Sequence, residues 1–325
     1  MGVPFVVEAL MRIGVIDIGT NTMLLLIAEC RDNTVAGIEH AYRVTRLGRG
    51  VDAHRRIEEQ TFRTCLQTIV GFWHSMKRYN CDRMIITGTS ALREVTNRDE
   101  FIASVKSQTG LEVEVLSGEE EARWTFAGGL SSMPIDGLYA VLDIGGGSTE
   151  LAIGTHVDLQ RYASIDAGAV RITERFFRHD PPTPEELAKA RTFILQGLEY
   201  FPVIDPLKTT VIGVAGTVTT LAALDRNLKT YIPDQVTGHV LSRNFVEKTF
   251  HRFSSIPVQE IRELLTVEPG RSDVITGGIL ILLTFMEHQN IESIVASDRG
   301  LRYGIAMREC ARINGVNAIS LPRVP

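Results

Sequence analysis

The chain alternates short apolar runs with longer segments that are apolar on one side only. Runs such as VIDI, MIIT, LEVEVL, VLDI and VIGV have the length of strands and border on Gly, Ser, Thr or Asn. Between them, apolar side chains recur every three or four residues, which is the period of a helix with one buried face. Strands alternating with helices predict an α/β protein.

Three segments carry specific helix signals. Residues 274–287 are almost wholly apolar apart from two threonines, which predicts a helix buried between layers. The stretch beginning Thr183-Pro184 combines an N-cap, a proline at the first helical position and Glu186 three residues after the cap. Residues 57–76 predict an amphipathic helix, because one face carries Ile57, Phe62, Cys65, Leu66, Ile69, Trp73 and Met76.

An internal repeat divides the chain into two similar halves. Residues 15–27 read VIDIGTNTMLLLI and residues 141–153 read VLDIGGGSTELAI, an offset of 126 (143 − 17). MIITGTSAL at 84–92 and VIGVAGTVTTL at 211–221 follow in the same order, with an offset of 128 (216 − 88). Each repeat opens as strand, turn, strand, which is typical of a hairpin. We expect a first domain over residues 1–125, completed by a C-terminal helix at 300–325, and a second domain over 126–299.

Composition and charge narrow the choice of partners. A length of 325 residues suits two domains of about 100–200 residues each. The net charge of -5 argues against non-specific nucleic-acid binding. No apolar run reaches the roughly 20 residues of a membrane span. A local basic run could still bind a polyanion, or it could be an ordinary solvated face. The run consists of Arg43, Arg46, Arg49, Arg55 and Arg56.

The cysteines and the N-terminus bear on the compartment. Cys30, Cys65, Cys81 and Cys310 are widely spaced without a C-x-x-C pair, which favours buried thiols in a reducing compartment over disulfides or a zinc site. The opening MGVPFVVEALM lacks the basic region and the cleavage site of a secretory signal, so residues 1–10 read as a disordered extension or an upstream start. The expected location is cytoplasmic.

Both hairpin turns have the composition of a phosphate-binding loop. Backbone N–H groups of a glycine-rich turn point into its concavity, and small hydroxyl or amide side chains add donors. A lone glycine turn would be weak evidence, because Gly serves any tight turn. Here the turn occurs twice, each time after an apolar strand ending in Asp. The expected phosphate-binding residues are therefore Thr20, Asn21, Thr22, Gly145, Gly146, Gly147 and Ser148, together with Gly216 and Thr217 of the second repeated pair.

Asp17 and Asp143 stand at the ends of the strands that precede the turns. Each could cap its own turn by side-chain hydrogen bonds. Each could instead bind Mg²⁺, which proteins usually hold by one or two carboxylates plus substrate phosphate oxygens. The metal interpretation is stronger for Asp143, since Glu150 on the return strand of the same hairpin could supply a second oxygen.

Three acidic residues open the helix expected after LEVEVL. They suit a helix N-terminus in general, and Ser117 with Glu120 has the spacing of a capping box. Glu119 fits an exposed first turn. Glu121 lies on a face that continues toward Trp124, and a glutamate held near phosphates could accept a proton from an attacking water. The residues alone leave that role open.

Taken together, the motifs resemble the exopolyphosphatase/guanosine pentaphosphate phosphohydrolase family. They run in order from about residue 12 to residue 305: VIDIGTNTMLLLI, GTSALRE, SGEEEA, VLDIGGGSTELAIG, GVAGTVTTLAAL, GRSDVITGG and SDRGLRYG. DIGGG-like turns alone occur across actin-like ATPases and sugar kinases, whereas the joint set is specific. The resemblance implies a duplicated actin-like (ribonuclease H-like) ATPase fold with two domains and an interdomain cleft. It also implies Mg²⁺-dependent hydrolysis of a terminal phosphoanhydride of polyphosphate or guanosine pentaphosphate.

The resemblance implies roles for individual residues. Glu121 falls on the family's catalytic base, and Asp143 and Glu150 fall on the acidic positions of its DIGGGS-x-E hairpin, with Asp17 as a further expected metal ligand. Arg93 falls on the Arg of the GT-x-x-x-R motif and is expected to clamp phosphate, since a guanidinium can bind phosphate oxygens bidentately.

Some alternatives stay open. Arg93 could instead form a salt bridge with Glu94 or Asp99. Tyr303 stands where the family usually has Glu, and the chain resembles the short members because it ends at Pro325 without their longer relatives' helical extension. A kinase or ATPase of the same superfamily and a non-catalytic alarmone-binding regulator are the rival functions. The sequence does not rank the two substrates, and a homodimer would extend a groove for a long polymer.

Overall fold

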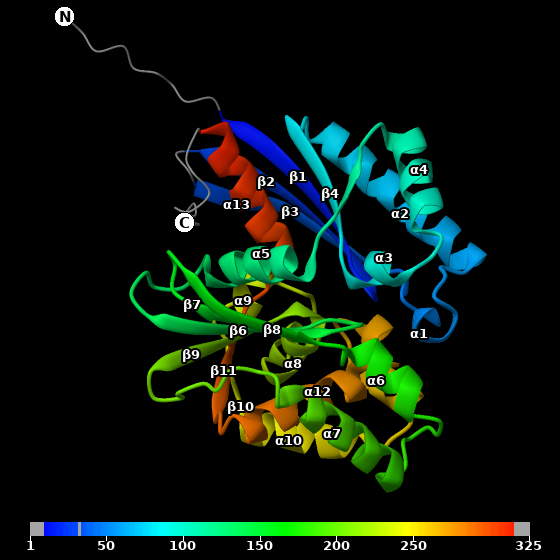
Figure 1. Ribbon diagram of the computed structural model, residues 1–325, viewed down its shortest axis with the longest axis vertical. Helices are drawn as coiled ribbons and strands as arrows, with labels where there is room; N and C mark the ends of the chain where they lie inside the picture. The colour runs from blue at the N-terminus through cyan, green and yellow to red at the C-terminus, as the bar shows by residue number, and fades with distance from the viewer. Residues whose placement is uncertain (1–9, 32–33, 315–325) are drawn as a thin grey trace, which may run out of the picture.

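The computed structural model describes residues 10–31 and 34–314, which form two α/β halves stacked on one another (Figure 1). Residues 1–9 and 315–325 lie outside the described residues. The expectations about the N-terminal extension and about the end of the C-terminal helix fall on these residues. Within the described ranges, no helix is long and apolar enough to cross a lipid bilayer.

The first half is built on a sheet with the strand order β3-β2-β1-β4-β5. Its strands are β1 (Met11–Ile18), β2 (Thr22–Arg31), β3 (Thr34–Val44), β4 (Arg83–Gly88) and β5 (Val113–Val115). β1 and β2 form the predicted hairpin, β3 extends it, and β4 and β5 continue the sheet in parallel. The last six residues of β1 are buried, which explains its almost wholly apolar sequence.

The second half repeats this arrangement with the order β10-β11-β9-β6-β7-β8. Its strands are β6 (Leu138–Ile144), β7 (Thr149–Gly154), β8 (Leu159–Ile165), β9 (Thr209–Val214), β10 (Val240–Ser242) and β11 (Ser293–Ala296). β6, β7 and β8 are antiparallel, and β9 and β11 continue in parallel, so the sheet matches that of the first half with β10 added at its edge. The predicted duplication and the actin-like fold are confirmed.

Helices cover the faces of both sheets (Figure 1). In the first half, α2 contacts β1, β2 and α4, while α13 packs on β1, β2 and β3. In the second half, α12 contacts α6, α7 and α10, and its first twelve residues are all buried, as the apolar run predicted. The helices are α1 (Val51–His54), α2 (Glu59–Arg78), α3 (Ser90–Glu94), α4 (Arg98–Thr109), α5 (Gly118–Leu130), α6 (Ala169–Phe176), α7 (Pro184–Leu198), α8 (Ala215–Asp225), α9 (Pro233–Val236), α10 (Arg243–Phe253), α11 (Val258–Leu264), η1 (Pro269–Arg271), α12 (Ile275–His288) and α13 (Leu301–Ile313).

Local signals placed the helix starts well. Both capping boxes are formed, at the N-terminus of α5 and at that of α7, where Pro184 is the first residue of the helix. The amphipathic helix expected over 57–76 begins at Glu59, and Ile57 lies just ahead of it, with its N–H donated to Asn97. The Asn97 amide also donates to the Ile57 carbonyl, so both backbone groups of Ile57 are bonded outside the helix.

Helix α5 lies between the two halves. It contacts α13 on one side and β6, β7, β8 and β9 on the other. The expected domain boundary at 125/126 therefore falls within a continuous helix. The division of the chain at that point stays a prediction.

Two cysteines form a disulfide that the sequence analysis did not expect. Cys30 at the end of β2 is bonded to Cys310 on α13, 280 residues away. The prediction of unpaired thiols is wrong for this pair, because the fold brings the last described helix, α13, against β2. It holds for Cys65 and Cys81, which are free and buried. Disulfides are typical of oxidising compartments, so the expected cytoplasmic location stays a prediction.

Candidate active site

The two glycine-rich turns meet face to face at the centre of the molecule. We name them the first turn (Gly19–Thr22) and the second turn (Gly145–Ser148). Each is closed by the same bond, from the N–H of its first residue to the carbonyl of its last, at 3.2 and 3.0 Å. A Cβ on Gly146 would lie 2.9 Å from the Cβ of Thr20, so only glycine allows this close approach. The repeat in the sequence thus becomes a pair of facing loops.

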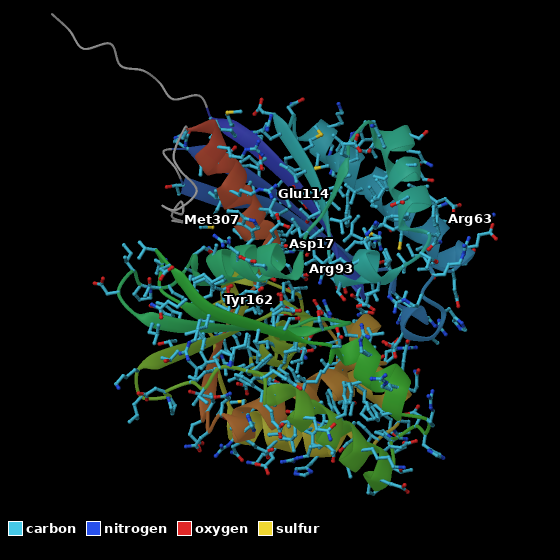
Figure 2. All side chains as sticks on the ribbon, in the orientation of Figure 1. Asp17, Arg63, Arg93, Glu114, Tyr162 and Met307 are labelled. Carbon is cyan, nitrogen blue, oxygen red and sulfur yellow. A yellow bond between two sulfur atoms is a disulfide. The ribbon has the colours of Figure 1, made fainter. Side chains whose placement is uncertain are left out.

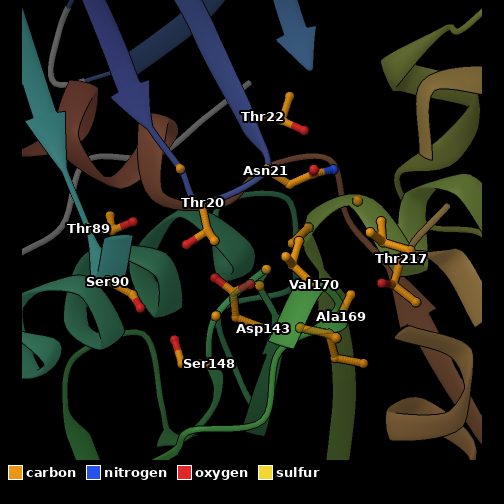
Figure 3. A pocket seen from close by; sticks show the side chains of 18 of the residues that line it. Thr20, Asn21, Thr22, Thr89, Ser90, Asp143, Ser148, Ala169, Val170 and Thr217 are labelled. Carbon is orange, nitrogen blue, oxygen red and sulfur yellow. The ribbon is translucent and has the colours of Figure 1, made fainter. Parts of the chain in front are cut away.

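A cavity of about 120 Å³ lies between the turns (Figure 3). We call it the first cavity. The first residues of α6 and α8, including Ala169, Val170 and Thr217, also line it. The leading N–H groups of a helix lack intrahelical partners, so the N-terminus of α8 favours an anion. The first N–H groups of α6 instead donate to the carbonyls of Gly145 and Gly146 and hold the second turn. The amide nitrogen and oxygen of Asn21 and the hydroxyl of Thr22 are buried without hydrogen-bond partners among the described residues, as expected for polar groups that contact a ligand.

Asp17 and Asp143 lie at the floor of this cavity. Burial, and then the charges of Glu121 and Asp143, raise the pKa of Asp17 from 3.8 to about 7. Burial, followed by the charge of Glu121, raises the pKa of Asp143 to about 7. Oδ1 of Asp17 has no hydrogen-bond partner within the described part of the chain. The interpretation that Asp17 caps its own turn is therefore not supported for this oxygen, and the site favours protons or cations.

Glu121 lies near the N-terminus of α5. It faces the first cavity and has 9% of its surface exposed. Arg93 Nη1 donates to its Oε2 at 2.6 Å. Burial raises the pKa of Glu121, and the charge and hydrogen bond of Arg93 oppose that rise. Glu120 forms the predicted capping box. Its carboxylate accepts a hydrogen bond from the Ser117 backbone N–H at 2.9 Å, and this bond lowers the pKa of Glu120. The two neighbouring glutamates thus have different environments.

Arg93 does not form the salt bridges considered from the sequence. Glu94 pairs with Arg171, and Asp99 pairs with Arg98. Arg93 instead donates to the Leu116 carbonyl at 2.9 Å and to Glu121, and it does not line the first cavity. Figure 2 shows Arg93 and Asp17 near the junction of the two halves. A direct clamp on phosphate stays a prediction.

Glu150 is the cross-strand partner of Asp143 in the β6–β7 hairpin. It is buried, accepts a hydrogen bond from Ser164 at 2.7 Å, and does not line the first cavity. Burial raises its pKa well above the usual value. Among the described residues, no group of three or more His, Cys, Asp or Glu side chains could hold a metal by itself. A Mg²⁺ site here would need substrate oxygens as well, and the unpartnered oxygen of Asp17 fits such a site.

Comparison with known proteins agrees with this geometry. The model of the Ppx/GppA phosphatase family matches residues 26–312. The chain belongs to this family. It is 32% identical to "Exopolyphosphatase 2" of Mycobacterium tuberculosis over 92% of this chain and 98% of that protein. It is 28% identical to "Guanosine-5'-triphosphate,3'-diphosphate pyrophosphatase" of Vibrio vulnificus, covering 90% of this chain and 58% of that protein. The solved Ppx/GppA family member of Aquifex aeolicus superposes with a TM-score of 0.79 and 34% identity, over 94% of this chain and 99% of that one.

The structure of this Ppx/GppA phosphatase adds residues that the sequence analysis did not assign. Arg271 lines the first cavity and ion-pairs with Glu268, and a Cβ on Gly216 would overlap its guanidinium. Its signal was present, because it lies in the GRSDVITGG motif. A second cavity of about 410 Å³ shares Asp17, Asp143 and Arg271 with the first.

The position left open at Tyr303 does not line either cavity, although its neighbour His40 lines the second one. Tyr303 is 4% exposed, lines neither of them, and its hydroxyl is 3.5 Å from His40 Nε2. Burial raises its pKa. Tyr303, a residue of α13, therefore packs in the core against His40 of β3.

Proposed function

We propose that this phosphatase releases terminal orthophosphate from inorganic polyphosphate, from the 5'-end of guanosine pentaphosphate, or from both. The observation that carries the proposal is Glu121, a buried carboxylate held by Arg93 and directed at a cavity between two phosphate-type turns. The names of the exopolyphosphatase and guanosine pentaphosphatase relatives support both substrates. Neither rival function, a kinase or a non-catalytic regulator, gains support from those names.

The terminal phosphate would bind in the first cavity. The N–H groups of the two turns, the hydroxyls of Thr20 and Ser148 and the start of α8 at Gly216 and Thr217 surround this space. Figure 3 shows Asp143 between Thr20 and Ser148. Phosphoryl transfer depends mainly on positioning and on stabilising charge on the phosphoryl oxygens, and preorganised donors provide both. The second cavity leaves room for the remainder of the substrate.

Glu121 would accept the proton of the attacking water. A general base works best when its pKa lies near the operating pH, and burial moves Glu121 in that direction. Arg93 would orient the carboxylate and keep it ionised at neutral pH. The opposed walls of the cleft would exclude bulk water from the reacting phosphate.

Mg²⁺ would be held by Asp143 and Asp17 together with substrate oxygens, and Glu150 lies opposite Asp143 in the β6–β7 hairpin. The ion supplies positive charge to the phosphoryl oxygens when bound. Burial and the neighbouring carboxylates raise the pKa of Asp17 and Asp143, so a bound cation would stabilise the ionised form of both side chains. Cytoplasmic location and a homodimer stay predictions.

Phosphate release from both substrates, measured with Mg²⁺ and no other nucleotide, tests this function. We expect release of orthophosphate from at least one of them, with chain shortening by one phosphate at a time. A superfamily kinase would instead require a nucleotide and an acceptor. Tight binding of guanosine pentaphosphate without release from either substrate would favour the regulator and refute the proposal.

A further inference from the structure

A network of ion pairs joins the two halves beside the first cavity. Its centre is Arg171 on α6, whose side chain is 13% exposed. Nη2 donates to both carboxylate oxygens of Glu94 at 2.8 and 2.9 Å, and Nη1 donates to Asp52 at 2.7 Å. Glu94 lies on α3 and Asp52 on α1, both in the first half. One guanidinium of the second half therefore binds side chains of two helices, α1 and α3, of the first half.

The same guanidinium also holds the second turn. Nε of Arg171 donates to the carbonyl of Gly147 at 2.9 Å. That carbonyl and the N–H of Ser148 belong to one planar peptide and point in opposite directions. Anchoring the carbonyl to Arg171 therefore fixes the direction of a donor in the phosphate-type turn.

Glu94 connects this network to the residues around the base. Ser90, which lines the first cavity, donates to Glu94 at 3.0 Å. Arg93, next to Glu94 on the same short helix, donates to Glu121 at 2.6 Å. A shift of α3 would therefore move both a cavity hydroxyl and the partner of the base.

We propose that Arg171 is a positioning residue of the reaction, which fixes α3 of the first half against the second turn and thereby sets the place of the Arg93–Glu121 pair. Arg171 does not line the first cavity, so it acts through Gly147 and Glu94. The inference rests on the proposed role of Glu121. Each of the three guanidinium nitrogens of Arg171 has a partner, which fixes the orientation of the group. A displacement of about 1 Å at the reacting groups can cost on the order of 100-fold in rate.

The test compares phosphate-release kinetics of Arg171→Met, Glu94→Gln and the double variant with the wild type. We expect kcat to fall by about 10- to 100-fold in Arg171→Met, with a smaller change in KM, because the cavity donors remain but their alignment with the base is lost. The double variant should lose little more than the worse single variant. Arg175→Met is the matched control: Arg175 lies one turn on along α6, is 47% exposed, and reaches Asp52 only at 3.9 Å. It should keep kcat within about twofold of wild type, because surface substitutions usually have small effects.

Thermal unfolding measured alongside separates positioning from stability. A fall in kcat at a temperature where the variant stays folded supports the proposal. Wild-type kcat in Arg171→Met, or losses in the two single variants that multiply in the double variant, would overturn it. If Arg171→Met does not fold, Glu94→Gln, which keeps the shape of the side chain, decides by the same kcat criterion. Full activity in Glu121→Gln would refute the proposed role of Glu121, and no release by the wild type would refute the proposed function itself. Loss in Glu121→Gln with full activity in Arg171→Met refutes only the role of Arg171.

Discussion

Replacing Asp17 by Asn should stabilise the metal-free protein at alkaline pH. Asp17 is 9% exposed, its Oδ1 has no hydrogen-bond partner within the described residues, and it faces Glu121 and Asp143. A raised pKa in the folded state means that folding keeps a proton which the unfolded chain has already lost. Stability therefore falls as pH rises from about 4 to about 7, and the whole loss is present above that range. Asparagine carries no charge at any pH and removes the loss.

The magnitude follows from the change in pKa. A rise from 3.8 to about 7 corresponds to roughly 4 kcal/mol, at about 1.4 kcal/mol per pKa unit. Part of this is shared with Asp143, so we expect Asp17→Asn to raise the free energy of unfolding by about 2–4 kcal/mol at pH 8. At pH 4 the aspartate is protonated and nearly isosteric with asparagine. The expected difference there is close to zero.

Urea unfolding in EDTA at pH 4, 6 and 8, followed by circular dichroism, measures this directly. Asp136→Asn is the control, because Asp136 is an exposed acid outside both cavities. The gain should appear only for Asp17→Asn and should grow with pH. An equal gain at all three pH values, or none at pH 8, would refute the electrostatic reasoning.

Three further predictions concern other parts of the protein. Gly168→Ala places a Cβ against the Gly146 backbone and should lower kcat/KM by about tenfold or more. The control Gly71→Ala, at a position of α2 with open space around it, should keep activity and add up to about 1 kcal/mol of stability. Wild-type kcat/KM in Gly168→Ala would contradict this prediction. Arg93→Met removes the charge that lowers the pKa of Glu121, so the acid limb of the kcat/KM pH profile should move to higher pH, and an unmoved limb argues against Glu121 as base. Replacing both Cys30 and Cys310 by Ser should lower the free energy of unfolding by about 2–5 kcal/mol relative to wild type in oxidising buffer. In reducing buffer, where the wild type has no disulfide, the difference should disappear. Equal losses in both buffers would mean that the cysteines stabilise the fold by packing.

Features that depend on local chemistry were readable from the sequence. Ser117 and Glu120 needed only their spacing to indicate a capping box, and Thr183 with Pro184 marked the start of α7. The repeat around Asp17 predicted two facing turns, because duplicated halves bring equivalent loops to one cleft. Once the capping box had accounted for Glu120, Glu121 was left as the glutamate able to face the cavity.

Contacts between distant segments were not readable in the same way. Arg93 meets Glu121 across 28 residues, and Arg171 meets Glu94 across 77. Each of these arginines has other carboxylates close to it in the sequence. The packing of α3, α5 and α6 determines which carboxylate each arginine pairs with. The disulfide between Cys30 and Cys310 likewise depends on α13 returning to the first sheet.

The central claim is tested most directly by phosphate release from Glu121→Gln beside Glu120→Gln, on long-chain polyphosphate and on guanosine pentaphosphate with Mg²⁺. Both substitutions remove one negative charge from adjacent positions of α5, and glutamine still serves the capping box at position 120. The account predicts that Glu121→Gln loses at least about 100-fold in kcat, as expected for removal of a general base, while Glu120→Gln stays near wild type. Near-wild-type release by Glu121→Gln, or an equal loss in both variants, would contradict it.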